Sequence, residues 1–401
     1  MKSRRATMGN ELTMNEQLNT LKRARLLIEH LAPEVSIYMW GPPGVGKTTM
    51  VREVCEEKGW QLVELHLSRH EAVDLRGFPT LSEDRTTARF VPFEDILPVP
   101  GKCAERGVLF LDELNLATLD VQKAVYQLCL ERRVGSYKLP EGWKVVAASN
   151  RPEDNPMVVE RLQPPLANRF IHVVIEPPMS AEARLDFYSW LMRHGVHPSV
   201  ISYLKWRPDA IFNQMDAEVD LAFPTPRSWH KLSIALNSPG LEIMDGRGLI
   251  RHDKLDMVRY LAAGCVGQRE GALFCEFVDL CWTNRARIEM PNAEEILTVG
   301  PEEAGVQKAL AACTGEKRIA LQYAMGTAVN AALLTNRSYW DKRGIANYSS
   351  FLSTLEPEIQ ALCAREALAH QELREVLIKS KEFGQQVSKK LLQILTPTLT
   401  P

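Results

Sequence analysis

Eight consecutive residues have the composition and spacing of a phosphate-binding loop. They read Gly41-Pro42-Pro43-Gly44-Val45-Gly46-Lys47-Thr48 and fit the pattern G-x-x-x-x-G-K-[ST]. Glycines let the backbone turn tightly and direct its N–H groups at phosphate oxygens. We expect Lys47 to meet the β- and γ-phosphates and Thr48 to offer its hydroxyl to Mg²⁺, with Thr49 in the same nucleotide-binding set. The alternative, a glycine-rich turn with an exposed lysine, is disfavoured by the flanking strand-like and helix-like stretches.

Two acidic residues follow the apolar run Val108-Leu109-Phe110-Leu111. By itself an acidic pair after a strand often marks only a solvated turn. Together with the phosphate-binding loop, Asp112 and Glu113 predict a Walker B site. Asp112 would orient the magnesium ion, and Glu113 would polarise the attacking water as the base-like residue.

A neutral amide ends another apolar run, Val145-Val146-Ala147-Ala148-Ser149-Asn150. An amide can hydrogen-bond the γ-phosphate or the attacking water without adding charge. We therefore interpret Asn150 as a γ-phosphate sensor. The open alternative is an Asx turn before Arg151-Pro152.

Five short apolar runs must position these side chains, at residues 36–40, 62–67, 108–111, 145–148 and 172–175. Their alternation with helix-like stretches predicts an α/β fold with a parallel sheet flanked by helices. Residues 68–106 are too long for an ordinary connection and include a turn at 74–79, so we interpret them as an inserted functional element. Residues 133–143 predict a β-hairpin before the next strand.

The second half of the chain has helical patterns. Pro177-Pro178 ends the sheet region, and Ser180 with Glu182 predicts the capped, acidic first turn of a new helix. We expect an α/β core at 1–178, with the insert at about 68–106 and the hairpin at about 133–143. A helical segment at 179–290 and a helical C-terminal extension at 291–401 would follow.

The amino-acid composition argues against several classes of function. The 48 lysines and arginines nearly balance the 50 aspartates and glutamates, and the net charge of -2 provides no global field for nucleic acid. The eight cysteines never form a C-x-x-C pair, which argues against a zinc site or a disulfide framework. We find no apolar signal sequence and no run of transmembrane length, so we expect a cytoplasmic protein without membrane partners.

The loop at 41–48, the run from Val108 to Glu113 and Asn150 together resemble the AAA+ ATPases. Details resemble the MoxR branch: Asp112-Glu113-Leu114-Asn115, Leu139-Pro140-Glu141-Gly142-Trp143 and Val146-Ala147-Ala148-Ser149-Asn150. The likeness covers roughly residues 20–290. It implies a P-loop NTPase core with a helix-2 insert and a hairpin before sensor 1, a helical lid, ATP and Mg²⁺ as cofactors, and a homo-oligomeric, commonly hexameric ring.

The same resemblance gives two arginines a role. Arg169, in Leu166-Ala167-Asn168-Arg169-Phe170, resembles the arginine finger that reaches a neighbouring subunit's ATP. Arg227, in Phe223-Pro224-Thr225-Pro226-Arg227, resembles sensor 2 on the lid. Arg161 competes with Arg169 for the finger role, and either Arg169 or Arg227 could instead be an ordinary surface residue.

The leading hypothesis is a MoxR-type AAA+ ATP hydrolase that remodels or activates a protein partner as a chaperone-like factor, often with a von Willebrand factor A domain protein. The alternative is a nucleic-acid-stimulated motor or loader, which would need a local basic groove. A nucleotide-dependent switch with little turnover is a third reading. The Arg337, Tyr339 and Trp340 cluster fits either a partner patch or, as we favour, a helix end covering a core.

Overall fold

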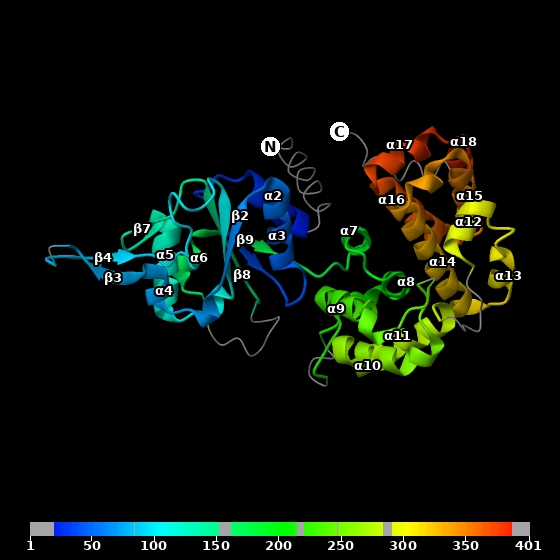
Figure 1. Cartoon of the computed structure of the whole chain (residues 1–401), viewed down its shortest axis with the longest axis horizontal. Coiled ribbons are helices and arrows are strands. Elements are labelled where there is room, and N and C mark those ends of the chain that lie inside the picture. Colours follow the sequence, from blue (N-terminus) through cyan, green and yellow to red (C-terminus); the bar gives the residue numbers. More distant parts are fainter. Residues whose placement is uncertain are drawn as a thin grey trace, which may run out of the picture. The chain divides into compact units, whose positions relative to one another are not determined.

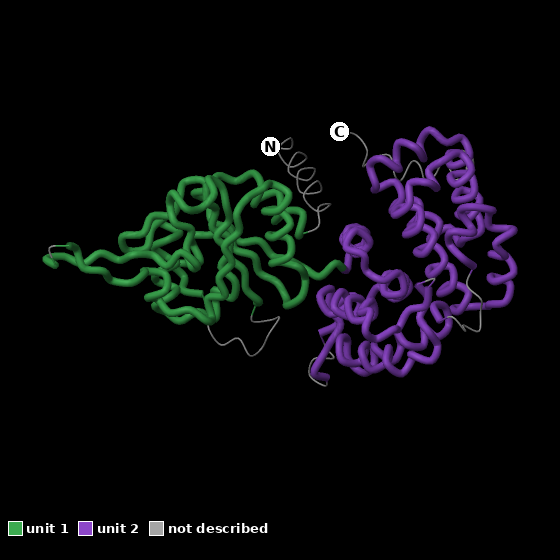
Figure 2. Tube along the Cα trace, viewed as in Figure 1, with its two compact units in different colours: residues 1–178 green, residues 179–401 purple. Residues whose placement is uncertain are grey.

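The computed structural model describes residues 20–83, 85–151, 162–214, 220–246, 248–283 and 291–386. The chain divides into two compact units, residues 1–178 and residues 179–401 (Figure 2).

Unit 1 is built on a five-stranded parallel sheet with the strand order β2-β5-β8-β1-β9. The strands are β1 Ser36–Trp40, β2 Gln61–His66, β5 Gly107–Asp112, β8 Trp143–Ser149 and β9 Phe170–Val174. They coincide with the five apolar runs of the sequence to within two residues at each end. The predicted parallel sheet is therefore confirmed.

Helices cover both faces of this sheet (Figure 1). Helices α2 Thr20–His30 and α3 Lys47–Lys58 lie on one side, and α4 Ala72–Arg76, α5 Leu119–Glu131 and α6 Pro164–Ala167 lie on the other. Side chains of a strand alternate between faces, and Leu109 and Leu111 share a core with Val121 and Val125 of α5. Val108, Leu109, Phe110 and Leu111 are all buried. Burial on both faces explains why this strand is a continuous apolar run.

The parallel arrangement brings three loops to one edge of the sheet. Trp40 pairs with Ser149, and Asp112 pairs with Ala148, so β1, β5 and β8 end at nearly the same level. The residues that follow these strands therefore start side by side. Such an edge is where ligands bind in open α/β sheets.

The insert after β2 forms the 3-10 turn η1 Leu67–Arg69, helix α4 and a two-stranded hairpin, β3 Phe78–Leu81 and β4 Ala88–Val91. The turn predicted at 74–79 is only partly correct, because α4 includes residues 74–76. The Asp74 carboxylate accepts a hydrogen bond from the N–H of Glu71 at 2.9 Å, which stabilises this short helix. Gly77 then turns the chain at φ +88°, where its missing Cβ leaves room for the carbonyl of Val91.

A second, shorter hairpin joins β6 Arg133–Val134 to β7 Tyr137–Lys138. The Ser136 hydroxyl at its turn donates to the backbone carbonyl of Phe90 at 2.8 Å. The two hairpins are thereby linked, and the β3–β4 hairpin extends beyond this contact, away from the sheet (Figure 1).

The regular elements of unit 2 within its described residues are helices, and two isolated β-bridges join Ile250 to Met244 and Thr283. Its α-helices are α7 Ala181–Arg193, α8 Pro198–Trp206, α9 Pro226–Leu236, α10 Leu255–Val266, α11 Gln268–Cys281, α12 Ala293–Val299, α13 Val306–Ala311, α14 Gly315–Thr335, α15 Lys342–Leu352, α16 Pro357–Ala369, α17 Gln371–Lys379 and α18 Lys381–Gln386. The predicted cap is confirmed, because the Ser180 hydroxyl accepts from the N–H of Ala183 at 3.2 Å. Within the described ranges, every helix falls short of the length and hydropathy that crossing a membrane requires.

Short 3-10 turns complete the architecture: η2 Leu114–Leu116 in unit 1, and η3 Pro208–Ile211, η5 Pro239–Leu241, η6 His252–Lys254 and η7 Arg337–Trp340 in unit 2. Unit 2 contains two hydrophobic clusters, one built mainly from residues 188–282 and the other from residues 296–383. Helix α14 serves both, because Ala320 and Ala324 pack into the first while Leu321 and Met325 pack into the second. The two clusters therefore share a structural element.

Candidate nucleotide-binding site

The loop between β1 and α3 has the backbone geometry of an anion-binding turn. Gly44 has φ +78° and Gly46 has φ +101°, both in the region that favours glycine. A Cβ on Gly41 would lie 2.2 Å from the carbonyl oxygen of Ile175, just beyond β9. These glycines are therefore required by conformation and by close approach. The N-terminus of α3 follows at once, and its N–H groups and dipole favour bound phosphate.

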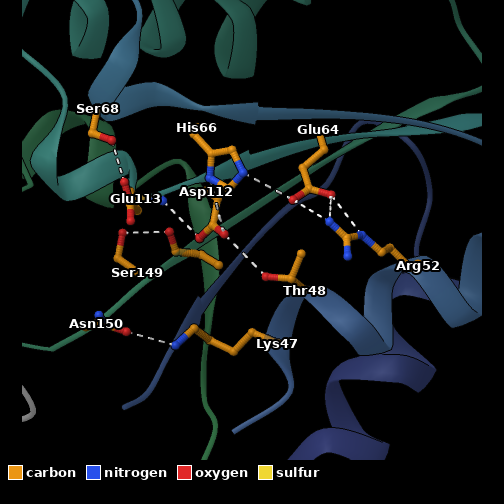
Figure 3. A network of polar contacts seen from close by, with 11 residues as sticks. Lys47, Thr48, Arg52, Glu64, His66, Ser68, Asp112, Glu113, Ser149 and Asn150 are labelled. Atoms are coloured by element: carbon orange, nitrogen blue, oxygen red, sulfur yellow. Dashed lines mark hydrogen bonds and ion pairs between the residues drawn. The ribbon is translucent and has the colours of Figure 1, made fainter. Parts of the chain in front are cut away.

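Lys47 is the first residue of α3, and only 8% of it is exposed. Its Nζ donates to the carbonyls of Gly41 at 2.6 Å and Pro42 at 3.0 Å. It also donates to Asn150 Oδ1 at 3.0 Å (Figure 3). These three acceptors are neutral oxygens, which orient the ammonium group without cancelling its charge. The side chain is thus held at the edge where the loops after β1 and β8 meet.

Thr48 and Asp112 lie next to each other at the same edge. The Thr48 hydroxyl donates to Asp112 Oδ2 at 3.3 Å (Figure 3). Burial raises the pKa of the Asp112 carboxyl above its usual value, while the N–H of Glu113 and the charge of Lys47 act in the opposite direction. The two predicted magnesium residues are therefore brought together by the fold.

The donor set of these two residues fits Mg²⁺. A hydroxyl and a carboxylate are the hard oxygen ligands that this ion prefers. Asp112 also lies within ligand distance of Glu64 and His66, but Arg52 already binds the Glu64 carboxylate through three hydrogen bonds of 2.8 to 3.0 Å. Thr48 and Asp112 are therefore the residues that would hold Mg²⁺, which when bound supplies positive charge next to the phosphates.

Glu113 adopts an unusual backbone conformation directly after β5. Its φ of 57° and ψ of 34° lie in the left-handed region, which costs free energy for a residue with a side chain. Its N–H donates to Asp112 Oδ1 at 3.0 Å, and its carboxylate accepts from the Ser68 hydroxyl (Figure 3). The carboxylate thus lies against Ser68, in the segment that follows β2.

Asn150 follows β8 and presents its side-chain oxygen to Lys47. Its backbone carbonyl accepts from the Asn115 side chain at 3.1 Å. This carbonyl contact joins the segment after β8 to the segment after β5. Asn150 is thus held through both its side chain and its backbone carbonyl. The alternative interpretation, an Asx turn, did not require these contacts.

Arg169 lies at the opposite end of the sheet from this site. It precedes β9, and Phe170 pairs with Ser36, the first residue of β1, whereas the phosphate-binding loop follows the last. Five residues of strand, about 16 Å, separate the two levels. The exposed guanidinium packs over the ring of Tyr126 at 5.3 Å and donates to its hydroxyl at 3.1 Å. Arg169 therefore cannot contact a phosphate held by the loop of its own chain.

Arg227 belongs to unit 2. It is exposed in the first turn of α9. Thr225 and Ser228 cap this helix reciprocally, with the Thr225 hydroxyl accepting from the N–H of Ser228 at 3.0 Å and the Ser228 hydroxyl from the N–H of Thr225 at 2.7 Å. The cap gives Arg227 a rigid base.

Two other sequence hypotheses have different outcomes. Arg161 lies outside the described residues. Trp340 donates from its indole to the carbonyl of Leu333 at 2.8 Å and packs against the core formed by residues 296–383, with Arg337 over its ring. This arrangement supports the interpretation as a helix end covering a core.

Sequence reasoning missed four polar residues that support the site: Tyr38, Ser68, Asn115 and Ser149. Asn115 is 3% exposed and Ser149 2% exposed, so both are buried polar residues that must be hydrogen-bonded. Ser68 and Ser149 stand near strand ends that the parallel sheet brings to this edge. The predicted parallel sheet was the one signal that could have placed these serines near the site, but a serine has no distinctive sequence pattern that marks such a role.

The fold and the site define a P-loop nucleoside triphosphatase domain. Residues 37–176 match the model of the family described as "ATPase family associated with various cellular activities (AAA)". Unit 1 therefore contains a P-loop domain of the AAA ATPase type. The match ends within unit 1 and includes every site residue from Gly41 to Arg169.

Two curated relatives resemble parts of the chain. Midasin from Giardia intestinalis is 28% identical over 182 residues, which are 43% of this chain and 4% of midasin. The replication factor C large subunit from Pyrobaculum calidifontis is 52% identical over 33 residues, which are 8% of each protein. The chain thus spans only a small part of the length of these relatives.

Among solved structures, NtrX from Brucella abortus in complex with ADP aligns with 83% of this chain and 69% of its own at 14% identity and a TM-score of 0.36. NtrX in a second structure covers 59% of this chain and 56% of its own at a TM-score of 0.34. With TM-scores this low, the fold assignment rests on the strand order and the family model.

Proposed function

We propose that this protein is a MoxR-type AAA+ ATPase that hydrolyses ATP in a homo-oligomeric ring and couples hydrolysis to the remodelling or activation of a protein partner. One observation carries the proposal: Lys47, Asp112, Glu113 and Asn150 converge at one sheet edge, while Arg169 stands exposed at the other. A site complete except for a distant arginine suits a ring whose neighbours contribute that arginine.

Each residue has a proposed role in the reaction. The loop 41–48 and Lys47 bind the phosphates, and Glu113 polarises the water that attacks the γ-phosphate. Asn150 reads the γ-phosphate through its amide. Arg169 of a neighbouring copy offsets the charge that develops on the transferred phosphoryl group. Residues 179–290 act as the lid with Arg227 as sensor 2, and residues 291–401 form a C-terminal extension.

The exposed side chains of the β3–β4 hairpin favour a protein as the partner. Phe78 is 62% exposed and Leu81 61% exposed, both on β3, which among the described strands pairs only with β4. Exposed apolar residues on a protruding hairpin are typical of protein contacts rather than of contacts with phosphate backbones. By the family resemblance, a von Willebrand factor A domain protein is the partner class to test first.

A nucleic-acid-stimulated motor or loader is the second candidate. The observation in its favour is the local likeness to the replication factor C large subunit. Duplex DNA should then stimulate ATP hydrolysis, and the stimulation should disappear at high salt because phosphate contacts release counterions. A rate unchanged by duplex at low salt would remove this candidate.

The decisive experiment measures ATPase rate against protein concentration for the parent and Arg169→Ala, with each sample sized by light scattering with and without ATP. We expect activity to rise with assembly and to fall by about 10³-fold or more in Arg169→Ala, while this variant still assembles. Arg133→Ala is the matched control, because Arg133 is exposed and pairs with Glu131 on the same unit. Full activity of a monomer, with Arg169 dispensable, would refute the shared site.

A further inference from the structure

A buried polar chain connects the ends of three neighbouring strands beneath the site. Asn115, in the turn η2 after β5, donates from its backbone N–H to Ser149 Oγ at 3.2 Å and from Nδ2 to the Asn150 carbonyl at 3.1 Å. Ser149 Oγ also lies 2.7 Å from the hydroxyl of Tyr38 on β1. Asn115, which follows β5, thus holds two consecutive residues at the end of β8, and Tyr38 of β1 supports the contact to Ser149.

The proton inventory fixes the direction of these hydrogen bonds. The Ser149 hydroxyl has one proton, which it donates to the Ala148 carbonyl at 2.7 Å, so it accepts from both Asn115 and Tyr38. Burial raises the pKa of the Tyr38 phenol well above its usual value, so Tyr38 remains a donor at neutral pH. Every contact in the chain is therefore satisfied in one orientation, which makes the chain rigid.

The chain ends on catalytic groups at both sides. Asn115 lies two residues after Glu113, and the carbonyl of Glu113 accepts from the N–H of Leu116 at 2.9 Å within the same turn. On the other side, the carbonyl that Asn115 holds belongs to Asn150, whose side chain contacts Lys47. A displacement of η2 therefore moves the strained Glu113 and the amide of Asn150 together.

We propose that Asn115 is a positioning residue that couples Glu113 to Asn150, so that water activation and γ-phosphate sensing are set by one hydrogen bond. This inference rests on the proposed ATPase function and adds a residue to it. Asn115 acts through the position of the Asn150 main chain and contacts no substrate. A misplacement of about 1 Å in such a group lowers turnover by up to about 100-fold.

The test is a double-mutant cycle of Asn115→Ala and Asn150→Ala in the full-length protein, with kcat and ADP affinity measured for each variant. We expect Asn115→Ala to lower kcat roughly 10- to 100-fold and to leave ADP affinity within about twofold. In the Asn150→Ala background the same change should lower kcat by less than about twofold, because the group it positions is already gone.

Unit 2 provides matched controls. Asn330 is fully buried, donates to the Cys363 carbonyl at 3.0 Å and accepts from the Tyr348 hydroxyl at 2.9 Å, but belongs to the other unit. Asn330→Ala creates a comparable buried defect and should leave kcat within about threefold. If the fold losses of kcat in the two single variants multiplied in the double variant, the two residues would act independently and the proposed coupling would be overturned. Parental kcat in Asn115→Ala, or an equal loss in Asn330→Ala, would do the same.

Tyr38→Phe keeps the test decisive if Asn115→Ala does not fold. It removes only the hydroxyl that supports Ser149, and we expect kcat to fall about 3- to 10-fold, with Tyr348→Phe as its control. Parental kcat in Tyr38→Phe would then count against the chain. A parent without any ATP turnover would defeat the proposed function separately. The inference would still predict that Asn115→Ala weakens binding of a non-hydrolysable ATP analogue more than that of ADP, and an equal loss would refute it.

Discussion

Two polar networks, one in each unit, use similar residues for different ends. In unit 1, Lys47 donates to backbone carbonyls and to Asn150 at the edge of the sheet. In unit 2, Lys205 on α8 is 1% exposed and lies 2.8 Å from the Glu366 carboxylate on α16, which is fully buried. Both networks thus combine a lysine with an asparagine, and in the second a carboxylate lies directly against the lysine.

The network of unit 2 includes two further polar side chains. Glu366 also accepts from the Asn330 side chain at 2.9 Å, and Lys205 donates to the Thr327 hydroxyl at 3.2 Å. A buried charge that is neutralised and hydrogen-bonded holds helices in register but has no capacity for a ligand. The comparison teaches that the surroundings of the side chain distinguish the two lysines, because Lys47 lies at a sheet edge and Lys205 lies against a buried carboxylate.

The largest expected effect is on Glu113. Glu113→Gln keeps the size of the side chain but removes the carboxylate that polarises water, so ATP hydrolysis should fall about 10²- to 10⁴-fold while ATP still binds. Turnover and nucleotide retention on the purified protein measure both quantities. Glu94→Gln, an exposed residue paired with Lys102, is the control. Hydrolysis at the parental rate in Glu113→Gln would show that the functional network has been misassigned.

The next effect tests the structural network. Lys205→Met leaves the Glu366 carboxylate buried without its counter-charge and should lower the free energy of unfolding by about 3–5 kcal/mol. Adding Glu366→Leu should recover most of this loss, because an apolar pair replaces the ion pair. Urea unfolding followed by circular dichroism measures each variant. If the double variant were as unstable as the single one, the buried pair would not explain the stability of this region.

A smaller effect depends on pH. His197 is buried in unit 2 between the Ser199 N–H at 3.2 Å and the Gly248 carbonyl at 3.2 Å, and burial lowers its pKa to about 4. Below pH 6.5 the unfolded chain binds a proton that the folded chain does not. Stability is therefore complete above pH 6.5, falls as the pH drops toward 4, and should be about 2 kcal/mol lower at pH 5 than at pH 7.

Urea titrations at several pH values give this slope. His197→Asn preserves a small polar side chain but cannot titrate, so the variant should lose this part of the pH dependence. An unchanged slope in His197→Asn would show that other groups cause the acid sensitivity of unit 2.

The smallest effect concerns an ion pair at the rim of the site. Arg52 binds Glu64 through several hydrogen bonds, but the Arg52 side chain is 55% exposed. Arg52→Gln should therefore change the free energy of unfolding by less than about 1 kcal/mol and ATP turnover by less than about twofold. A large loss of ATP turnover would show that the Arg52–Glu64 pair belongs to the functional network.

Much of unit 1 could be predicted from the sequence. The loop 41–48 could be recognised by its glycine spacing, because glycine is favoured at the positive φ of Gly44 and Gly46 and at the close approach of Gly41 to Ile175. The β5 and β8 runs are apolar throughout because both sheet faces are covered. The parallel fold then predicts that Asp112, Glu113 and Asn150 share one edge.

The tertiary structure decided what the neighbouring side chains do. Ser68 contacts Glu113 and Asn115 holds Asn150 through pairings that follow from the strand order, and no local pattern marks a serine or an asparagine for such a role. The Lys205–Glu366 pair joins residues 161 positions apart. The conformation that the backbone needs locally depends on neighbouring residues, so the sequence by itself determines it. The charge and burial around a side chain depend on distant segments, which only the folded structure brings together.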